Sequence, residues 1–262
     1  SIVLLLKTQN FSRTKHLILP IQIANIIFRP TTTTLLGGQI SALYLFIATI
    51  AGVLWRQKKW FWGGAALAML TLKPSIGFPL LLIISPWLLL HKKIAALKGI
   101  ASTGVLLFLI GFIKDPHWIP KYLHILTTKL DKEFGNSPPS WGGAAMACQF
   151  DRQCTAWAGF ILLILFLGIN FWILHKWQKA PTLLIFGHLI SIGILSTLYL
   201  WPYDHLLLAI SIVSTMALLL EQGIHYLKVS FIFLGISLAS VIIRVATILS
   251  GLEKETIYGL LP

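Results

Sequence analysis

Two polar clusters interrupt an otherwise apolar sequence and carry side chains that could do chemistry. Lys73 ends an apolar run directly before Pro74, and Trp201–His205 (Trp-Pro-Tyr-Asp-His) separates two further apolar runs. A lysine can hold an anionic group, while Asp204 and His205 can transfer a proton or contact a phosphate. Plainer interpretations also exist. Lys73 can simply mark the membrane interface, and Asp204 can cap a helix that begins after a proline.

The stretch from residue 36 to residue 74 predicts an apolar helical hairpin that would carry Lys73. It begins with Gly-Gly-Gln-Ile-Ser, turns at the basic corner Arg56–Lys59 and returns to Lys73. Gln39 therefore falls at the same end as Lys73, and we expect a site on that side. Arg29 also precedes a proline, so it has the same two interpretations as Lys73, a functional cation or an interface anchor.

The composition identifies the class of protein that must hold these residues. Hydrophobic residues make up 56% of the 262 residues and charged residues 11%. A soluble domain of this length has too small an interior for that apolar content, so the sequence predicts a multi-pass membrane protein. The formal net charge of +13 does not indicate nucleic-acid binding, because the Lys and Arg residues lie in short clusters between apolar runs.

The apolar runs predict an all-α fold, a transmembrane helical bundle with about eight or nine membrane segments in a single domain over residues 1–262. Two runs, 16–29 and 60–73, are shorter than the roughly 20 residues that a full crossing needs. The first run, Ile2–Leu6, is shorter still, and we expect it to be the end of a helix whose N-terminal part is missing. The nine longer runs span residues 16–29, 38–55, 60–73, 75–91, 97–113, 156–174, 181–200, 204–220 and 228–249.

Charge predicts how these segments are oriented. Strict alternation places twelve of the 21 Lys and Arg residues on one side, together with a single acid, Glu221. By the positive-inside rule that side is cytoplasmic. Gln39, Lys73, the loop 114–155 and the turn Trp201–His205 are then extracytoplasmic. Arg244 lies inside the last run, where it is either a snorkelling side chain or part of a polar pocket.

The loop 114–155 is the longest stretch outside the apolar runs. Residues 117–134 mix aromatic and aliphatic residues at near-helical spacing with Lys and Asp, which predicts an amphipathic helix at the interface. Cys148 and Cys154 both lie in this loop. On an oxidising face they could form a disulfide, and two free thiols are an equal alternative. We expect no metal site, because a second pair of zinc ligands is missing nearby.

These motifs together resemble glycosyltransferase family 87, whose members are membrane enzymes of the GT-C type similar to polyprenol-phosphate-mannose-dependent mannosyltransferases. The resemblance rests on Gly38-Gln39-Ile40-Ser41, on Lys73-Pro74 and on Trp201–His205. Family members typically carry Asn where this chain has Ser41. A later Asn-Gln-Ser-like segment is loosely matched by Asn136-Ser137.

The resemblance implies transfer of a hexose, most simply mannose, from a polyprenyl-phosphate donor to a lipid or glycan acceptor, with inversion. It implies an active face outside the cell (inner or plasma) membrane and no nucleotide, metal or other cofactor. A carboxylate that deprotonates the acceptor is expected upstream of Ser1. Lys73 is the first candidate for stabilising the departing phosphate. The full set of candidates is catalytic Asp204 and His205 and substrate-binding Gln39, Lys73, Arg29, Tyr203 and Asn136.

Two other classes of protein fit the hydropathy. A transporter or flippase of lipid-linked sugars would share the apolar helices and a few intramembrane charges, but it should place its key groups near the bilayer midplane. A structural membrane subunit without activity is the third possibility. The concentration of polar residues at one face and the long aromatic loop favour the transferase.

Overall fold

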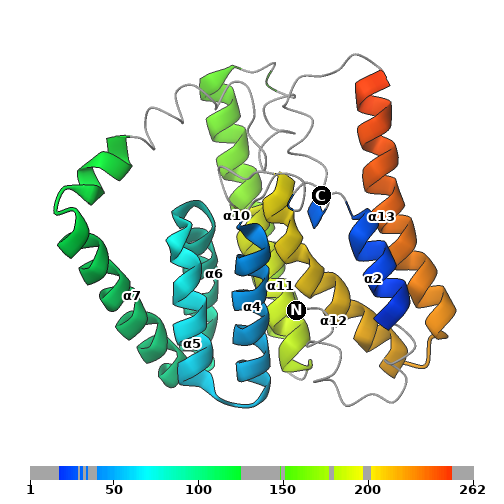
Figure 1. The fold of residues 1–262 in the computed structure, drawn as a ribbon, viewed down its shortest axis with the longest axis horizontal. Coiled ribbons are helices and arrows are strands. Elements are labelled where there is room, and N and C mark those ends of the chain that lie inside the picture. The colour runs from blue at the N-terminus through cyan, green and yellow to red at the C-terminus, as the bar shows by residue number, and fades with distance from the viewer. Residues whose placement is uncertain are drawn as a thin grey trace.

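The computed structural model of the chain describes residues 18–28, 30, 31, 34, 40–124, 148, 151–176, 180–196 and 202–249. Within these residues all regular structure is helical and no strand occurs. Figure 1 shows the helices gathered into a bundle, with α7 leaning away from the others. The predicted all-α class is therefore confirmed for the described part of the chain.

Each of the nine apolar runs contains a helix. The elements are α2 (Ile18–Ile27), α4 (Ser41–Arg56), α5 (Trp60–Ala68), the 3-10 helix η2 (Met69–Leu72), α6 (Pro74–Leu90), α7 (Ile94–Lys114), α10 (Arg152–Lys176), α11 (Thr182–Leu195), the 3-10 helix η3 (Pro202–Leu207), α12 (Leu208–Glu221) and α13 (Tyr226–Leu249).

Fewer helices than predicted are long enough to cross a membrane. In the described residues, three have the necessary length and apolar composition, namely Ile94–Lys114, Trp157–Lys176 and Asp204–Glu221. Other apolar helices are shorter, including Ser41–Arg56 and Pro74–Leu90. The helices predicted from the apolar runs are therefore confirmed, but a count of eight or nine membrane crossings is not.

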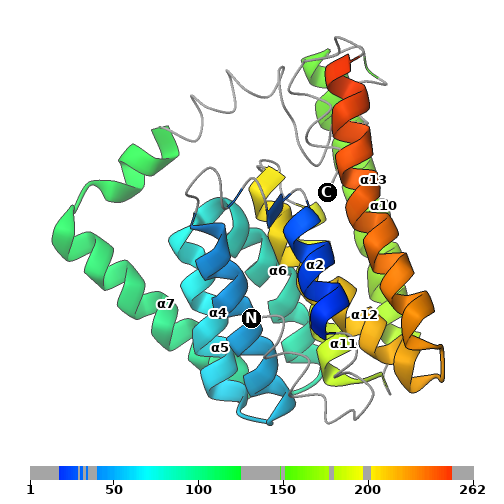
Figure 2. The same ribbon diagram turned by 45° about the vertical axis from the view of Figure 1, so that its right-hand side comes forward.

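Helix α11 lies at the centre of the bundle, where it packs against α4, α6 and α12 (Figures 1 and 2). Its Phe186, Leu189 and Ile190 are fully buried. At one end of the bundle Trp55 of α4 stacks on Trp87 of α6, with ring centroids 5.8 Å apart, and meets Phe186 edge-on at 5.0 Å. These contacts join three helices that are distant in sequence.

Three turns at this same end are built alike. After α4, Lys58 has φ 61° and its N–H bonds to the Trp55 carbonyl, while the next N–H reaches back to Leu54. Lys92 after α6 (φ 55°) and Gly223 after α12 (φ 86°) repeat this pattern. It is the Schellman ending of a helix, which normally favours glycine at the left-handed position. We call this the basic end, because Arg56–Lys59 and Lys92–Lys93 lie there.

Helices α5 and α7 approach closely at two glycines. A Cβ on Gly64 would lie 2.0 Å from the Ala96 carbonyl oxygen, and one on Gly99 would lie 2.0 Å from the carbonyl oxygen of Phe61. Small residues at helix contacts are typical of membrane bundles. Farther along, α7 exposes a run of large apolar side chains that suits contact with lipid. They are Val105, Leu106, Phe108, Leu109, Ile110, Phe112 and Ile113.

The loop after α7 folds back on that helix. Residues 118–124 are helical, and Trp118 packs edge-on against Phe108 at 5.9 Å. A hydrogen bond from Lys121, 2.7 Å long, is the main cause that lowers the pKa of Asp115. The rest of the helix predicted over 117–134 lies outside the described residues. Cys148 and Cys154 form a disulfide, which decides between the two alternatives left by the sequence.

Replacement of Gly64 by alanine should loosen the contact between α5 and α7. The new methyl group would meet the Ala96 backbone, which cannot move aside without shifting a helix. Overpacking of this kind costs about 1–3 kcal/mol. We expect a lower unfolding temperature of the purified protein in detergent. Gly104→Ala in α7 is the matched control, because nothing lies within 4 Å of its Cβ, and it should leave the temperature unchanged or raise it.

The orientation predicted from charge can be tested by cysteine labelling. Single cysteines placed at Lys58 and Lys92 should react with a membrane-impermeant reagent only after the cells are permeabilised, because we expect the basic end inside. A cysteine at the exposed Lys121 should react in intact cells. The native Cys148 and Cys154 are bonded to each other, so they add no background. If the cysteine at position 121 did not react in intact cells, the predicted orientation would be contradicted.

Candidate active site

Lys73 occupies the break between two helices. The chain leaves α5 through η2, adopts an extended conformation at Lys73 (φ −112°, ψ 90°) and starts α6 at Pro74. Proline disfavours a helical conformation in the residue before it and is well suited to the first position of a helix. The Lys73 carbonyl then accepts the N–H groups of Ile76 and Gly77. The sequence Lys-Pro thus fixes Lys73 at the tip of a helical hairpin.

Close packing under this tip leaves it little freedom. A Cβ on Gly77 would lie 2.4 Å from both Cα and N of Thr71, so the first turn of α6 touches the backbone of η2 directly. The Thr71 hydroxyl in turn donates to the Ala68 carbonyl at 2.6 Å. The Lys73 side chain therefore projects from a rigid base.

Asp204 is supplied by η3, the short helix that precedes α12. It lies in the first turn of that helix and is buried, as is His205 beside it. The η3 helix packs against α4 and α11. An aspartate in so apolar a place needs a partner, because an uncompensated buried charge is costly.

Two side chains compensate the buried Asp204 carboxylate. Lys73 forms an ion pair with Asp204 through Nζ and Oδ1, and the Ser41 hydroxyl donates to the same Oδ1 at 3.1 Å. Ser41 is the first residue of α4 and is itself buried. The Asp204 side chain is fully buried, whereas that of Lys73 remains 20% exposed. The cluster thus joins three segments and leaves part of the Lys73 side chain exposed.

The structure brings some of the predicted residues together and leaves others unplaced. Lys73, Asp204 and His205 lie at one end of the bundle, as alternation of the segments predicts. For Tyr203 the backbone belongs to η3, but its side chain is outside the described set. The remaining candidates, Gln39, Arg29 and Asn136, also lie outside the described residues.

Ser41 is the residue of this cluster that the sequence did not single out for a role. The family resemblance marks it only as a departure from the usual asparagine, although a serine near the start of the apolar run 38–55 is a typical helix-start residue. The hydrogen bond to Asp204 shows what a short polar side chain does at this position. Asparagine could donate to the same carboxylate through its amide.

The arrangement offers a cation held by a buried carboxylate, which in turn accepts a hydrogen bond from the Ser41 hydroxyl, and a cation suits electrostatic contact with an anionic group. No group of three or more His, Cys, Asp or Glu side chains that could hold a metal ion occurs in the residues the structure describes. The cluster's chemistry therefore has to be judged on Lys73 and its two neighbours.

Comparison with known proteins identifies the family. A model of glycosyltransferase family 87 matches residues 1–202, a range that includes Ser41 and Lys73 and ends two residues before Asp204. No curated protein and no solved structure matches the chain. The match covers most of the 262 residues, and the helices are apolar enough for a membrane protein. The chain belongs to glycosyltransferase family 87.

Proposed function

We propose that this chain transfers a hexose, mannose in the simplest case, from a polyprenyl-phosphate donor to a hydroxyl of a lipid or glycan acceptor. The transfer takes place at the extracytoplasmic face and inverts the anomeric carbon. The observation that carries the proposal is the cluster of Lys73, Asp204 and Ser41 at the end of the bundle opposite the basic end. Family membership supports glycosyl transfer, and the cluster supports a phosphate leaving group.

The charge on the donor changes during such a transfer. In the donor the phosphate is a diester with one negative charge. When the acceptor oxygen attacks the anomeric carbon, the bond from that carbon to the phosphate oxygen breaks and the phosphate leaves as a monoester with added negative charge. The acceptor proton passes to a carboxylate base. A fixed cation beside the phosphate therefore binds the transition state more strongly than the donor.

Lys73 is suited to this role by its partial exposure. Pro74 fixes the Lys73 backbone, and the ion pair with Asp204 holds its ammonium group. Part of the Lys73 side chain remains exposed. Asp204 serves as a positioning residue for that ammonium group, since its carboxylate already accepts hydrogen bonds from Lys73 and Ser41. His205, in the same turn, and Arg29 are further candidates for phosphate contact.

A flippase for lipid-linked sugars is the competing function, and the position of the cluster disfavours it. A transporter places its central polar groups near the bilayer midplane, where it can expose them alternately to both sides. Ser41 begins α4, Lys73 immediately precedes α6 and Asp204 lies in η3, so all three cluster residues lie at the end of the bundle opposite the basic end and not midway along it. A site at one membrane face suits a reaction between lipid-anchored substrates.

Loss of the Lys73 cation should lower the rate of transfer strongly. Removal of one preorganised stabilising group costs about 2–4 kcal/mol of transition-state stabilisation, or about 10²–10³ in kcat. We expect this loss for Lys73→Met in the full-length enzyme with a polyprenyl-phosphate-mannose donor. Lys121→Met is the matched control, because Lys121 also pairs with an aspartate but does so in an exposed loop. Full activity of Lys73→Met would refute the assignment.

A charge-swapped variant separates catalysis from stability. Lys73→Met alone leaves the buried Asp204 unpaired, and breaking a buried ion pair costs about 3–5 kcal/mol of folding stability. The double variant Lys73→Asp with Asp204→Lys keeps both charges at the same place, so its unfolding temperature should recover relative to Lys73→Met. Transfer should not recover, because the cation then projects from η3. Recovery of both the unfolding temperature and the transfer activity would mean that the ion pair has a purely structural role.

A further inference from the structure

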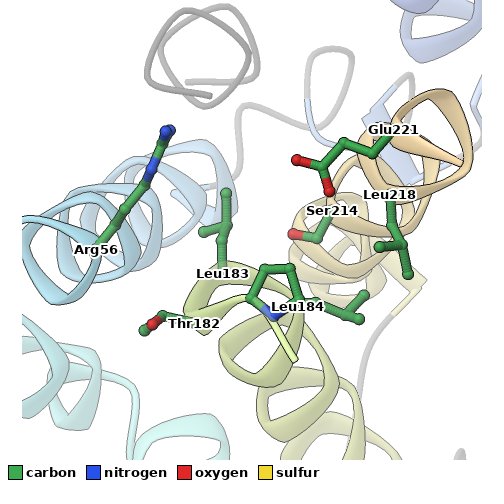
Figure 3. A pocket seen from close by; sticks show the side chains of 8 residues that line it. Arg56, Thr182, Leu183, Leu184, Ser214, Leu218 and Glu221 are labelled. Atoms are coloured by element: carbon green, nitrogen blue, oxygen red, sulfur yellow. The ribbon is translucent and has the colours of Figure 1, made fainter. Parts of the chain in front are cut away.

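A second polar feature lies at the basic end, away from Lys73 and Asp204. A cavity of about 110 Å³ opens there between α4, the first turn of α11 and the last turns of α12. Figure 3 shows Arg56 on one wall and Ser214 and Glu221 on the facing wall, with Thr182 and Leu183 between them. The cavity is larger than one water molecule needs. It lies about 22 Å from Ser41 along α4, given the rise of a helix.

One side of this cavity, formed by the end of α4 and the start of α11, consists of hydrogen-bond donors. The Nη1 atom of Arg56 is buried and has no hydrogen-bond partner among the residues that the structure describes. Helix α11 starts here after Pro181 with no side-chain cap, so its first turn points free N–H groups and the positive end of its dipole toward this region. A buried guanidinium nitrogen without an acceptor is costly. This side therefore suits an anion.

The α12 side consists of hydrogen-bond acceptors. The Ser214 hydroxyl donates a hydrogen bond to the Ile210 carbonyl at 2.6 Å. Its oxygen can therefore accept a hydrogen bond from a ligand but cannot donate a second one. Glu221 brings a carboxylate at the exposed end of α12. In the described structure Arg56 and Glu221 form no ion pair with each other, although both line the cavity. A ligand that is anionic at one end and carries N–H donors at the other would satisfy both walls.

We propose that this cavity binds the phosphoethanolamine headgroup of a membrane lipid. The phosphate lies against Arg56 and the start of α11, and the primary ammonium lies against Glu221 and Ser214. A lipid with a net negative charge fits less well because Glu221 repels it. A choline headgroup fits less well because its quaternary ammonium has no N–H to donate.

The surroundings favour a lipid over a soluble molecule of the same chemistry. Leu183 and Leu218 form apolar walls beside the charged ones. The cavity also lies where α4 ends in the exposed Lys58 and Lys59, which marks the level of the membrane interface. An acyl chain entering from the bilayer would find apolar surface there, whereas a soluble headgroup analogue gains nothing from it.

The test measures lipid binding and does not depend on transfer activity. The full chain is purified, delipidated in detergent and mixed with phosphatidylethanolamine, phosphatidylcholine or phosphatidylglycerol. Phosphatidylethanolamine should give the largest rise in unfolding temperature and a retained one-to-one adduct in native mass spectrometry. Arg56→Gln and Glu221→Gln should each weaken that binding about tenfold or more, since each removes a charged hydrogen bond.

Two controls make the result decisive. Lys59→Gln alters an exposed lysine in the same turn and should bind phosphatidylethanolamine like the unaltered chain. Glycerophosphoethanolamine, a soluble form of the headgroup, should give no shift at the concentration at which the lipid does. Three outcomes would each overturn the proposal: equal shifts in unfolding temperature with all three lipids, a shift with the soluble compound alone, or unchanged lipid binding by Glu221→Gln. The last variant is informative because Glu221 is exposed and its replacement should not impair folding.

Discussion

The ion pair between Lys73 and Asp204 constrains the rest of the bundle. Moving each charge out of water costs several kcal/mol, and this cost is offset only when the partner and further hydrogen bonds are in place. The start of α4, the turn before α6 and the helix η3 must therefore meet at one end. Burial strengthens the attraction between the two charges, and part of the Lys73 side chain remains exposed.

Much of this arrangement follows from sequence. Pro74 and Pro202 mark helix ends, and alternation of apolar runs brings those ends to one side, so the placement of Lys73 and Asp204 at the same end of the bundle follows from sequence. Hydropathy also located a helix in every run. It also marked residues 60–73 as too short for a full crossing, and the apolar helix there spans only Trp60–Leu72. The role of Ser41 depends on a contact 163 residues away in sequence.

Helix α4 connects two polar sites that differ in how their charges are compensated. At its start, Ser41 helps to satisfy an aspartate that already has a lysine, so that cluster is complete without a ligand. At its end, Arg56 has a buried nitrogen for which the described residues supply no acceptor. In the sequence Arg56 is one residue of the basic corner Arg56–Lys59, and nothing in such a corner reveals that one of its members turns inward.

The basic turns show a conflict between local backbone preference and the placement of charge at helix ends. Lys58 and Lys92 occupy left-handed positions that glycine would fill with less strain, as Gly223 does after α12. A side chain at such a position costs on the order of 1 kcal/mol. A lysine there adds a positive charge within a turn of a helix end, where it complements the negative C-terminal end of the helix dipole. The cost of the left-handed conformation is therefore offset in part by the favourable position of each lysine charge at the C-terminal end of a helix.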